Sequence, residues 1–293
     1  MLSYFKTVIG KNNFLIGSTL FVLLLLSWTA CNEAPELYQR TFSESEKKDI
    51  AKHMLRAHGF HYQGSAPNQF HMEEAWALDS LNADIIREIG IPYLKRGITA
   101  GFYPPYQEAI RLNARSWQGW RGYLYLYFYR DYERAIADFN AMDTLTPNFV
   151  DYPQATSVHL MRAVAYLKLK DYDECLRFLD LHIEEELKTA TEDWINPRTW
   201  LYLFMAHWEK GDLAKAETSL RRGLKNRPDN ADLWYWQAKL AVRQGQKSKA
   251  KAALEKAYDL LLKDFNNYRP YVEEFFQIYE SDVMGLKEEI LEM

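Results

Sequence analysis

The sequence is poor in cysteine, and this excludes one class of exported protein. Only two cysteines, Cys31 and Cys175, occur among 293 residues, so the multiple disulfide bonds that hold small secreted domains together cannot form. The chain must therefore be stabilised by its hydrophobic core. With 48% hydrophobic and 15% aromatic residues, its composition is that of a folded protein and lies well away from the disordered class.

The sequence also lacks an excess of charge of either sign. Its 36 Lys and Arg residues against 40 Asp and Glu residues give a net charge of −4. No long basic run stands out, whereas proteins that bind nucleic acids concentrate Lys and Arg on one face or in one segment. We therefore expect no nucleic-acid partner.

No motif of a known catalytic centre stands out. The sequence has no glycine-rich phosphate loop of the Walker type and no nucleophile elbow flanked by glycines. Its acidic groups, Glu184-Glu185-Glu186 and Glu273-Glu274, are typical of exposed helical faces. We expect a protein that is not an enzyme, with an unrecognised acid or histidine site as the open alternative.

The spacing of metal-ligating residues is equally uninformative. Four of the seven histidines lie early in the chain, at His53, His58, His61 and His71. A metal site needs three or four converging ligands, and neither a cysteine pair nor a spacing of the HExxH type supports one. We therefore predict no metal and no cofactor.

The first thirty residues differ in character from the rest of the chain. Lys6 and Lys11 are the only charged residues before Cys31, and the apolar run FLIGSTLFVLLLLSW extends from Phe14 to Trp28. A charged start, a short apolar core and small residues before a cleavage point are typical of a secretory signal peptide. The run is short for a membrane-spanning helix, which needs about 20 apolar residues.

The end of this run, Thr29-Ala30-Cys31, resembles the bacterial lipoprotein signal, although Trp28 stands where that signal usually has Leu. The resemblance implies a signal peptide over 1–30, a lipid on Cys31 and a polar tether within 31–48. It implies a location in the bacterial cell envelope and favours the outer membrane. An uncleaved anchor and plain secretion are the alternatives. A lipidated Cys31 would leave Cys175 without a disulfide partner.

A fixed period organises the second half of the sequence. Aromatic, glycine, alanine and leucine residues recur in one order at a spacing of 34 residues. The pairs are Trp200 and Trp234, Gly211 and Gly245, Ala216 and Ala250, and Leu220 and Leu254. A period in the mid-thirties is the mark of stacked helical repeats, each of which buries its apolar face against its neighbours.

The same pattern continues toward the N-terminus with insertions. Asp131 and Tyr132 recur 40 residues later as Asp171 and Tyr172, which indicates an insert over 148–154. The spacing of 41 between Cys175 and Ala216 indicates a second insert over 189–196. Units are predicted to start near Ala83, Ser116, Thr156, Pro197 and Ala231, after a degenerate first unit over about 50–82. Two helices are expected in each unit, with a break at Gly211 in the fifth. Cys175 stands at a small, buried position and is interpreted as structural.

The order of residues in these units resembles the tetratricopeptide repeat family. The positions that carry the resemblance are Trp200, Gly211, Ala216, Leu220 and Pro228 in one unit and Trp234, Ala238, Gly245, Ala250, Leu254 and Ala257 in the next. The resemblance implies an all-α, right-handed solenoid of helix–turn–helix repeats. Five to six repeats are expected over 49–264, followed by capping helices over 265–293, because a solenoid needs a polar outer face at its end.

In the phasing of that family, the first helix of each unit lines a concave groove. Residues one position after the packing positions would face it: Trp117, Trp120, Arg121, Leu124, Tyr127, Arg198, Leu201, Met205, Trp208, Tyr235, Lys239 and Arg243. An aromatic and basic lining suits an extended peptide that carries carboxylates. The alternative for each residue is that its side chain packs between adjacent repeats.

The resemblance therefore implies a membrane-anchored scaffold that binds a protein or peptide of the cell envelope in its groove. A glycan-binding lipoprotein of a nutrient-uptake system is the first alternative, because aromatic rings also stack on sugars. An enzyme with an unrecognised site is the second. The sequence indicates neither the identity of the partner nor the oligomeric state.

Overall fold

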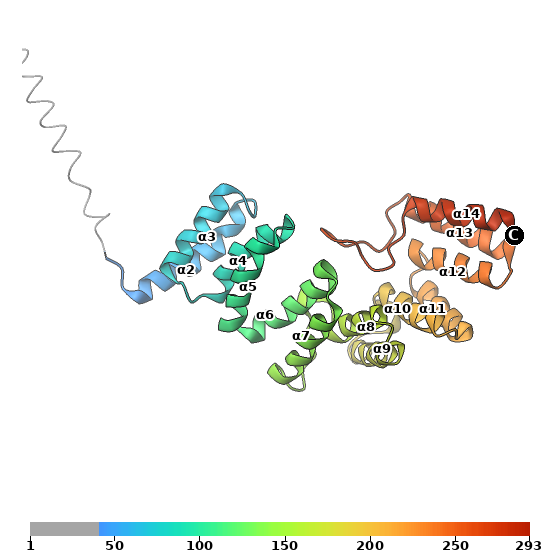
Figure 1. Ribbon diagram of the computed structural model, residues 1–293, viewed down its shortest axis with the longest axis horizontal. Coiled ribbons are helices and arrows are strands. Elements are labelled where there is room, and N and C mark those ends of the chain that lie inside the picture. Colours follow the sequence, from blue (N-terminus) through green and yellow to red (C-terminus); the bar gives the residue numbers. More distant parts are fainter. Residues whose placement is uncertain (1–40) are drawn as a thin grey trace, which may run out of the picture.

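The computed structural model describes residues 41–293, and that part of the chain consists of thirteen α-helices joined by turns and short loops, with no strand. The helices follow one another around an open arc (Figure 1). Within the same residues, no helix is both long enough and apolar enough to cross a membrane. The proposed signal peptide and Cys31 lie outside the described residues.

Twelve of the helices form six consecutive pairs, each helix packing mainly on the other member of its pair. The pairs are α2 (Glu44–Ala57) with α3 (Ala66–Leu78), α4 (Ala83–Lys95) with α5 (Thr99–Leu112), α6 (Ala114–Leu124) with α7 (Tyr132–Leu145), α8 (Val158–Lys168) with α9 (Tyr172–Glu186), α10 (Pro197–Glu209) with α11 (Leu213–Asn226), and α12 (Ala231–Arg243) with α13 (Lys247–Leu261). The predicted α-solenoid of helical repeats is confirmed.

Side-chain caps fix where many of these helices begin. Ser43 and Glu46 form a capping box at the start of α2, so the first helix begins earlier than the predicted boundary at 49. Asp131, Asp171 and Asp212 each accept a backbone N–H at the start of the second helix of a pair. A cap of this kind contributes about 1 kcal/mol, because it satisfies a donor that the helix leaves free.

The turn within each pair requires a residue with positive φ. Gly211 (φ 80°) and Gly245 (φ 70°) occupy this position in the last two pairs, as the repeated glycine predicts. Arg130 (φ 54°) and Lys170 (φ 63°) occupy it in the third and fourth pairs. In the third pair a π-helix, η3 (Tyr125–Tyr129), precedes the turn.

The two predicted inserts are confirmed as connections between pairs. The first contains the short helix η4 (Pro153–Ala155), and the second contains η5 (Glu192–Trp194). Three pairs begin at the predicted starts Ala83, Pro197 and Ala231, and two begin within two residues of the predicted starts Ser116 and Thr156. The first pair begins at Glu44, ahead of the predicted start near residue 50.

Small residues on the second helices allow the pairs to approach closely. Trp200 is fully buried, and a Cβ placed on Gly223 would lie 2.8 Å from its Cβ atom. Ala216, Leu220 and Cys175 are also fully buried, in the core that extends from α4 to α12. This is the close packing that small residues on the inner stripe predict.

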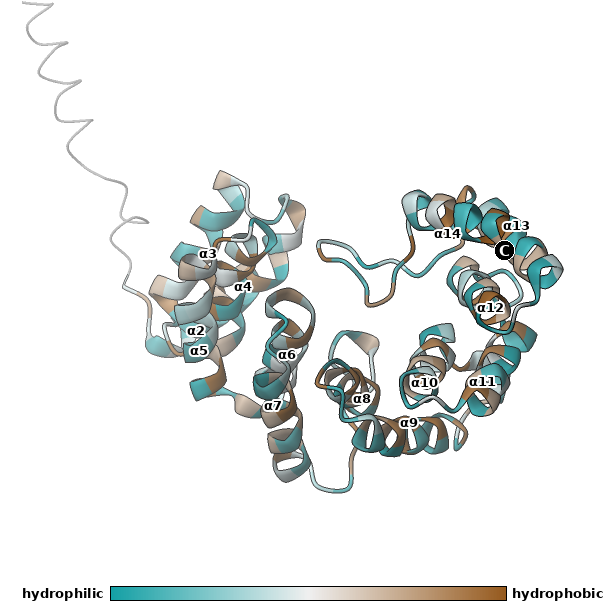
Figure 2. Ribbon diagram, turned by 45° about the vertical axis from the view of Figure 1, so that its right-hand side comes forward, coloured by the Kyte–Doolittle hydropathy of each residue, from teal (hydrophilic) through white to brown (hydrophobic). Residues whose placement is uncertain are grey.

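The C-terminal part differs from the prediction of capping helices over 265–293. A single helix, α14 (Glu280–Glu292), packs on α13. Residues 262–279, which we call the strap, contain no helix, since Pro270 lacks a backbone donor and Asp264, Tyr271 and Phe276 have positive φ. The strap leaves the ends of α13 and α14 and extends into the hollow of the arc toward α6 (Figure 2).

Candidate functional site

The concave face of the arc holds the strap through the first helices of five consecutive pairs. One contact on each helix shows the extent of this surface: Lys95 of α4 lies over Tyr271, Tyr123 of α6 meets Arg269, Lys168 of α8 lies over Phe276, Tyr202 of α10 meets Glu274, and Asp232 of α12 meets Asn267. The chain therefore lays a non-helical loop of its own, with turns at 270–271 and 275–276, across the groove that the repeats form.

The carboxylate of Glu274 is the most deeply buried charge of the strap, with a fully buried side chain. Its Oε1 accepts the hydroxyl of Tyr202 at 3.0 Å, and its Oε2 lies 3.1 Å from Nε of Arg198. Arg269 of the strap itself donates to Oε2 at 3.0 Å. Two arginines and a phenol thus compensate one carboxylate, as a buried charge requires.

The ring of Phe275 occupies the first of two aromatic seats that follow this carboxylate. Tyr127 and Tyr132 flank the ring at centroid distances of 5.4 and 6.3 Å. The guanidinium of Arg130 lies 4.1 Å above it, which adds a cation–π attraction. Only 5% of Phe275 is exposed.

The second seat holds Phe276. Tyr202 and Trp236 lie 6.2 and 6.4 Å from its centroid, and the ammonium of Lys168 lies 5.2 Å away. Aromatic walls, together with a cation over the bound ring, therefore define both seats. Such a seat favours an aromatic ring over an aliphatic side chain.

The two ends of the strap are fastened at the start of α12. The buried carboxylate of Asp232 accepts the backbone N–H groups of Asn267 and Ile278, and the backbone N–H of Ala231 donates to Phe265 at 2.7 Å. Burial raises the pKa of Asp232 to about 6, although these N–H groups oppose the shift. One side chain thus joins two strap residues that are separated along the chain.

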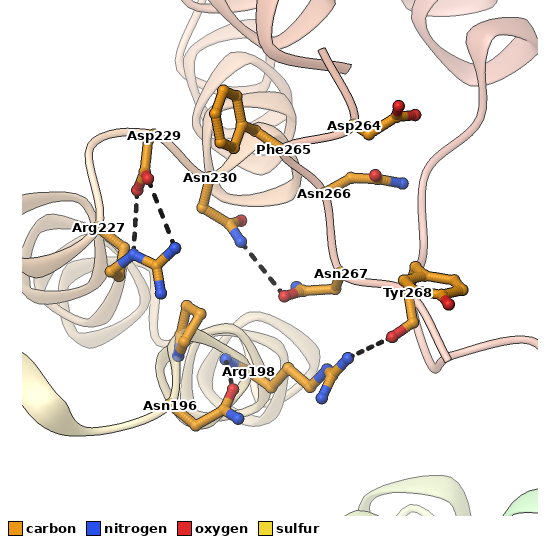
Figure 3. A pocket seen from close by; sticks show the side chains of 11 residues that line it. Asn196, Arg198, Arg227, Asp229, Asn230, Asp264, Phe265, Asn266, Asn267 and Tyr268 are labelled. Carbon is orange, nitrogen blue, oxygen red and sulfur yellow. Dashed lines mark hydrogen bonds and ion pairs between the residues drawn. The ribbon is translucent and has the colours of Figure 1, made fainter. Parts of the chain in front are cut away.

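A polar cavity of about 290 Å³ opens beside this fastening point (Figure 3). In it, the side-chain amide of Asn230 donates to Asn267 at 3.2 Å, and Arg198 donates to the carbonyl of Tyr268 at 2.6 Å. Arg227 is paired with Asp229. Both arginines that line the cavity therefore have an acidic partner within the protein.

The structure places the twelve predicted groove residues at different depths. Leu124, Tyr127, Leu201, Met205 and Tyr235 are buried; Trp117, Trp120, Arg121, Arg198, Trp208 and Lys239 are half-buried; Arg243 is exposed. Tyr127 and Arg198 contact the strap. Whether any of the twelve contacts a partner stays a prediction.

Several of these side chains are already engaged with neighbouring repeats. Arg121 forms a bidentate pair with the buried Asp138 at 2.8 and 2.7 Å, which ties α6 to α7. Trp117 and Trp120 face the guanidinium of Arg87 at 4.6 and 4.9 Å. This is the alternative interpretation, packing between repeats, and it applies to the tryptophans that the glycan hypothesis depends on.

Sequence reasoning missed other residues that meet the strap. They are Lys95, Tyr123, Arg130, Tyr132, Lys168, Tyr202, Asp232 and Trp236. The period of 34 contains part of the signal, because it aligns Tyr202 with Trp236 and Arg198 with Asp232. Sequence reasoning also placed Glu274 on an exposed helical face, which is wrong, since the residue is buried and lies outside any helix.

Two histidines of the first repeat, His58 and His71, contact backbone carbonyls of the same repeat. Nδ1 of His58 lies 2.5 Å from the carbonyl of Leu55, and Nε2 of His71 lies 3.0 Å from that of Met54. Among residues 41–293, no group of three or more His, Cys, Asp or Glu side chains is arranged to hold a metal ion.

Comparison with known proteins gives one match to a family and several to solved structures. Residues 201–261 match the tetratricopeptide repeat family, and no curated protein matches the chain in sequence. The fold is similar to that of a tetratricopeptide repeat protein from Parabacteroides merdae, with a TM-score of 0.51 and 15% identity over 85% of this chain and 84% of that one.

Two further structures share the fold. PilF from Pseudomonas aeruginosa has a TM-score of 0.55 and 14% identity over 73% of this chain and 93% of its own. PilW, described as a type IV pilus biogenesis factor, has a TM-score of 0.55 and 12% identity over 79% of this chain and 97% of its own. At these identities the likeness concerns the fold.

Proposed function

We propose that this chain, whose residues 201–261 match the tetratricopeptide repeat family, is a membrane-anchored scaffold whose concave face binds an extended segment of an envelope protein. One observation carries the proposal: the first helices of five pairs already hold a non-helical segment, the strap. Extended segments are a common class of ligand for preformed grooves, with side-chain seats providing the specificity.

An exposed cation on the concave face allows the proposed partner binding to be tested. Lys168 is exposed and lies over both aromatic seats. Lys168→Glu reverses a charge there without removing a buried group, so it should weaken partner binding at least about tenfold while the fold persists. Arg121→Glu is unsuitable, because Arg121 holds α6 to α7.

The experiment is affinity capture from the native envelope with three versions of the chain. Wild type and Lys225→Glu, an exposed residue on the second helix α11, should retain the same partner, and Lys168→Glu should lose it. Circular dichroism checks that all three are folded. Equal capture by all three would refute the concave face as the binding surface.

The membrane anchor is the second component of the proposal. It is supported by the charged start, the short apolar run and Thr29-Ala30-Cys31 in the sequence. A fatty-acid analogue fed to cells should label the wild-type chain and leave Cys31→Ala unlabelled. Labelling of both chains, or of neither, contradicts a lipid on Cys31.

A further inference from the structure

The strap is attached to the groove mainly by side chains. Its carbonyls at Tyr268 and Glu273 accept from Arg198 and Arg130, and its N–H at Asn267 donates to Asp232. A segment of a helix or sheet would satisfy these groups within its own backbone ladder. The strap is therefore bound in the manner of a peptide ligand, although it belongs to the same chain.

At one point the groove binds a carboxylate of the strap. Arg198 and the fully buried hydroxyl of Tyr202 both meet Glu274. If the strap left, both groups would lose this acceptor, and Arg198 would keep an uncompensated positive charge on the concave face. A segment that replaces the strap recovers both contacts when it brings a carboxylate to this point.

The two aromatic seats add a second requirement. They take the residues directly after the carboxylate, Phe275 and Phe276, which lie on different walls because Phe276 has a φ of 58°. In each seat a cation lies over the bound ring, Arg130 over Phe275 and Lys168 over Phe276. A competing segment with aliphatic side chains would forfeit these contacts.

We propose that the concave face is a receptor for an extended partner segment in which a carboxylate is followed directly by two aromatic residues, and that the strap occupies this receptor until such a segment displaces it. This inference rests on the proposed function and names the chemistry of its partner. The strap is the intramolecular competitor, and the partner segment is the occupant in the bound state.

Tethering explains why the strap controls access. A segment that is held at both ends, by α13 and α14, has an effective concentration in the groove on the order of millimolar. A free peptide of the same sequence therefore binds wild type only weakly. A change that weakens the strap increases the fraction of molecules whose receptor is unoccupied. The apparent affinity for the peptide rises in proportion to that fraction.

The test uses the full chain and a fluorescent synthetic peptide that copies residues 268–279 (YRPYVEEFFQIY). The double variant Phe275→Ala, Phe276→Ala empties both seats and should bind this peptide at least about tenfold more tightly than wild type in fluorescence anisotropy. A peptide carrying Glu274→Gln should bind the variant at least about tenfold more weakly. A peptide carrying Tyr268→Ala is the control and should bind unchanged, because the ring of Tyr268 is exposed and Arg198 contacts its backbone carbonyl, which alanine retains.

A second measurement covers the case in which the double variant does not fold. Hydrogen–deuterium exchange of residues 264–279 in wild type should accelerate when the peptide is added at millimolar concentration, and addition of the Glu274→Gln peptide should leave it unchanged. Failure of the peptide both to bind the folded variant and to accelerate exchange overturns the inference. Partner capture that still depends on Lys168 would then leave the proposed function standing.

Discussion

Replacing Glu274 by Gln should loosen the attachment of the strap more than any other single-atom change in it. The substitution keeps the size and shape of the side chain and removes its charge. Glu274 is 1% exposed, and its carboxylate meets Arg198 and Arg269. After the substitution the two guanidinium groups face each other with no anion between them.

The expected magnitude follows from these contacts. Removing one member of a buried ion pair costs about 3 to 5 kcal/mol, because the partner is left buried and uncompensated. The side chains of Arg198 and Arg269 keep 22% and 10% of their surface exposed, so water offsets part of this cost. We therefore expect the free energy of unfolding to fall by about 3 kcal/mol, measured in urea by tryptophan fluorescence.

The neighbouring residue provides a matched control. Glu273 is exposed, and its carboxylate accepts the hydroxyl of Tyr279, so Glu273→Gln should change the free energy of unfolding by less than about 0.5 kcal/mol. A loss below about 1 kcal/mol for Glu274→Gln would show that the two arginines do not depend on the carboxylate. The ionic argument for the receptor would then be refuted.

Three further predictions concern the repeats. Gly223→Ala should lower the free energy of unfolding, measured in urea, by about 2 kcal/mol, because the new methyl group would press on Trp200. Gly285→Ala is the control and should be neutral or stabilising, because Gly285 has open space around it. Burial lowers the pKa of His182 to about 4, so between pH 6.5 and pH 4 the unfolded chain binds a proton that the folded chain does not. The free energy of unfolding should therefore fall by up to about 3 kcal/mol over this range. His182→Asn should reduce this pH dependence. Burial raises the pKa of the Cys175 thiol, so mass spectrometry should find it unmodified by maleimide in the native chain and modified in urea.

The repeats could be predicted from the sequence because the features that define them are local. Pro197 and Ala231 are predicted starts and are the first residues of α10 and α12. Each start is set by an asparagine cap and each turn by a glycine with positive φ, as at Gly211. Caps and turn residues act over only a few positions, so a periodic sequence repeats them from unit to unit.

The groove residues were harder to predict, because their exposure depends on how successive pairs are rotated. One residue along a helix turns a side chain by about 100°, so an error of one position moves it from the groove to the interior. Leu201 is predicted to face the groove, whereas the structure places its neighbour Tyr202 against the strap; both side chains are fully buried. Arg121 was assigned by its charge, and its partner Asp138 lies on the following helix, 17 residues on.

The strap was beyond any argument from periodicity, and two adjacent identical residues show why. Glu273 and Glu274 are the same amino acid, yet one is exposed and the other is fully buried. The difference comes from Tyr202, which is 72 residues away in sequence, and from Arg198, which no local pattern connects to either acid. A pair of acids is typical of a solvated helical face, and only the tertiary contacts of the groove select one of them. The receptor would select the position of a carboxylate in a partner segment in the same way, because a carboxylate one residue away would leave Arg198 without its anion.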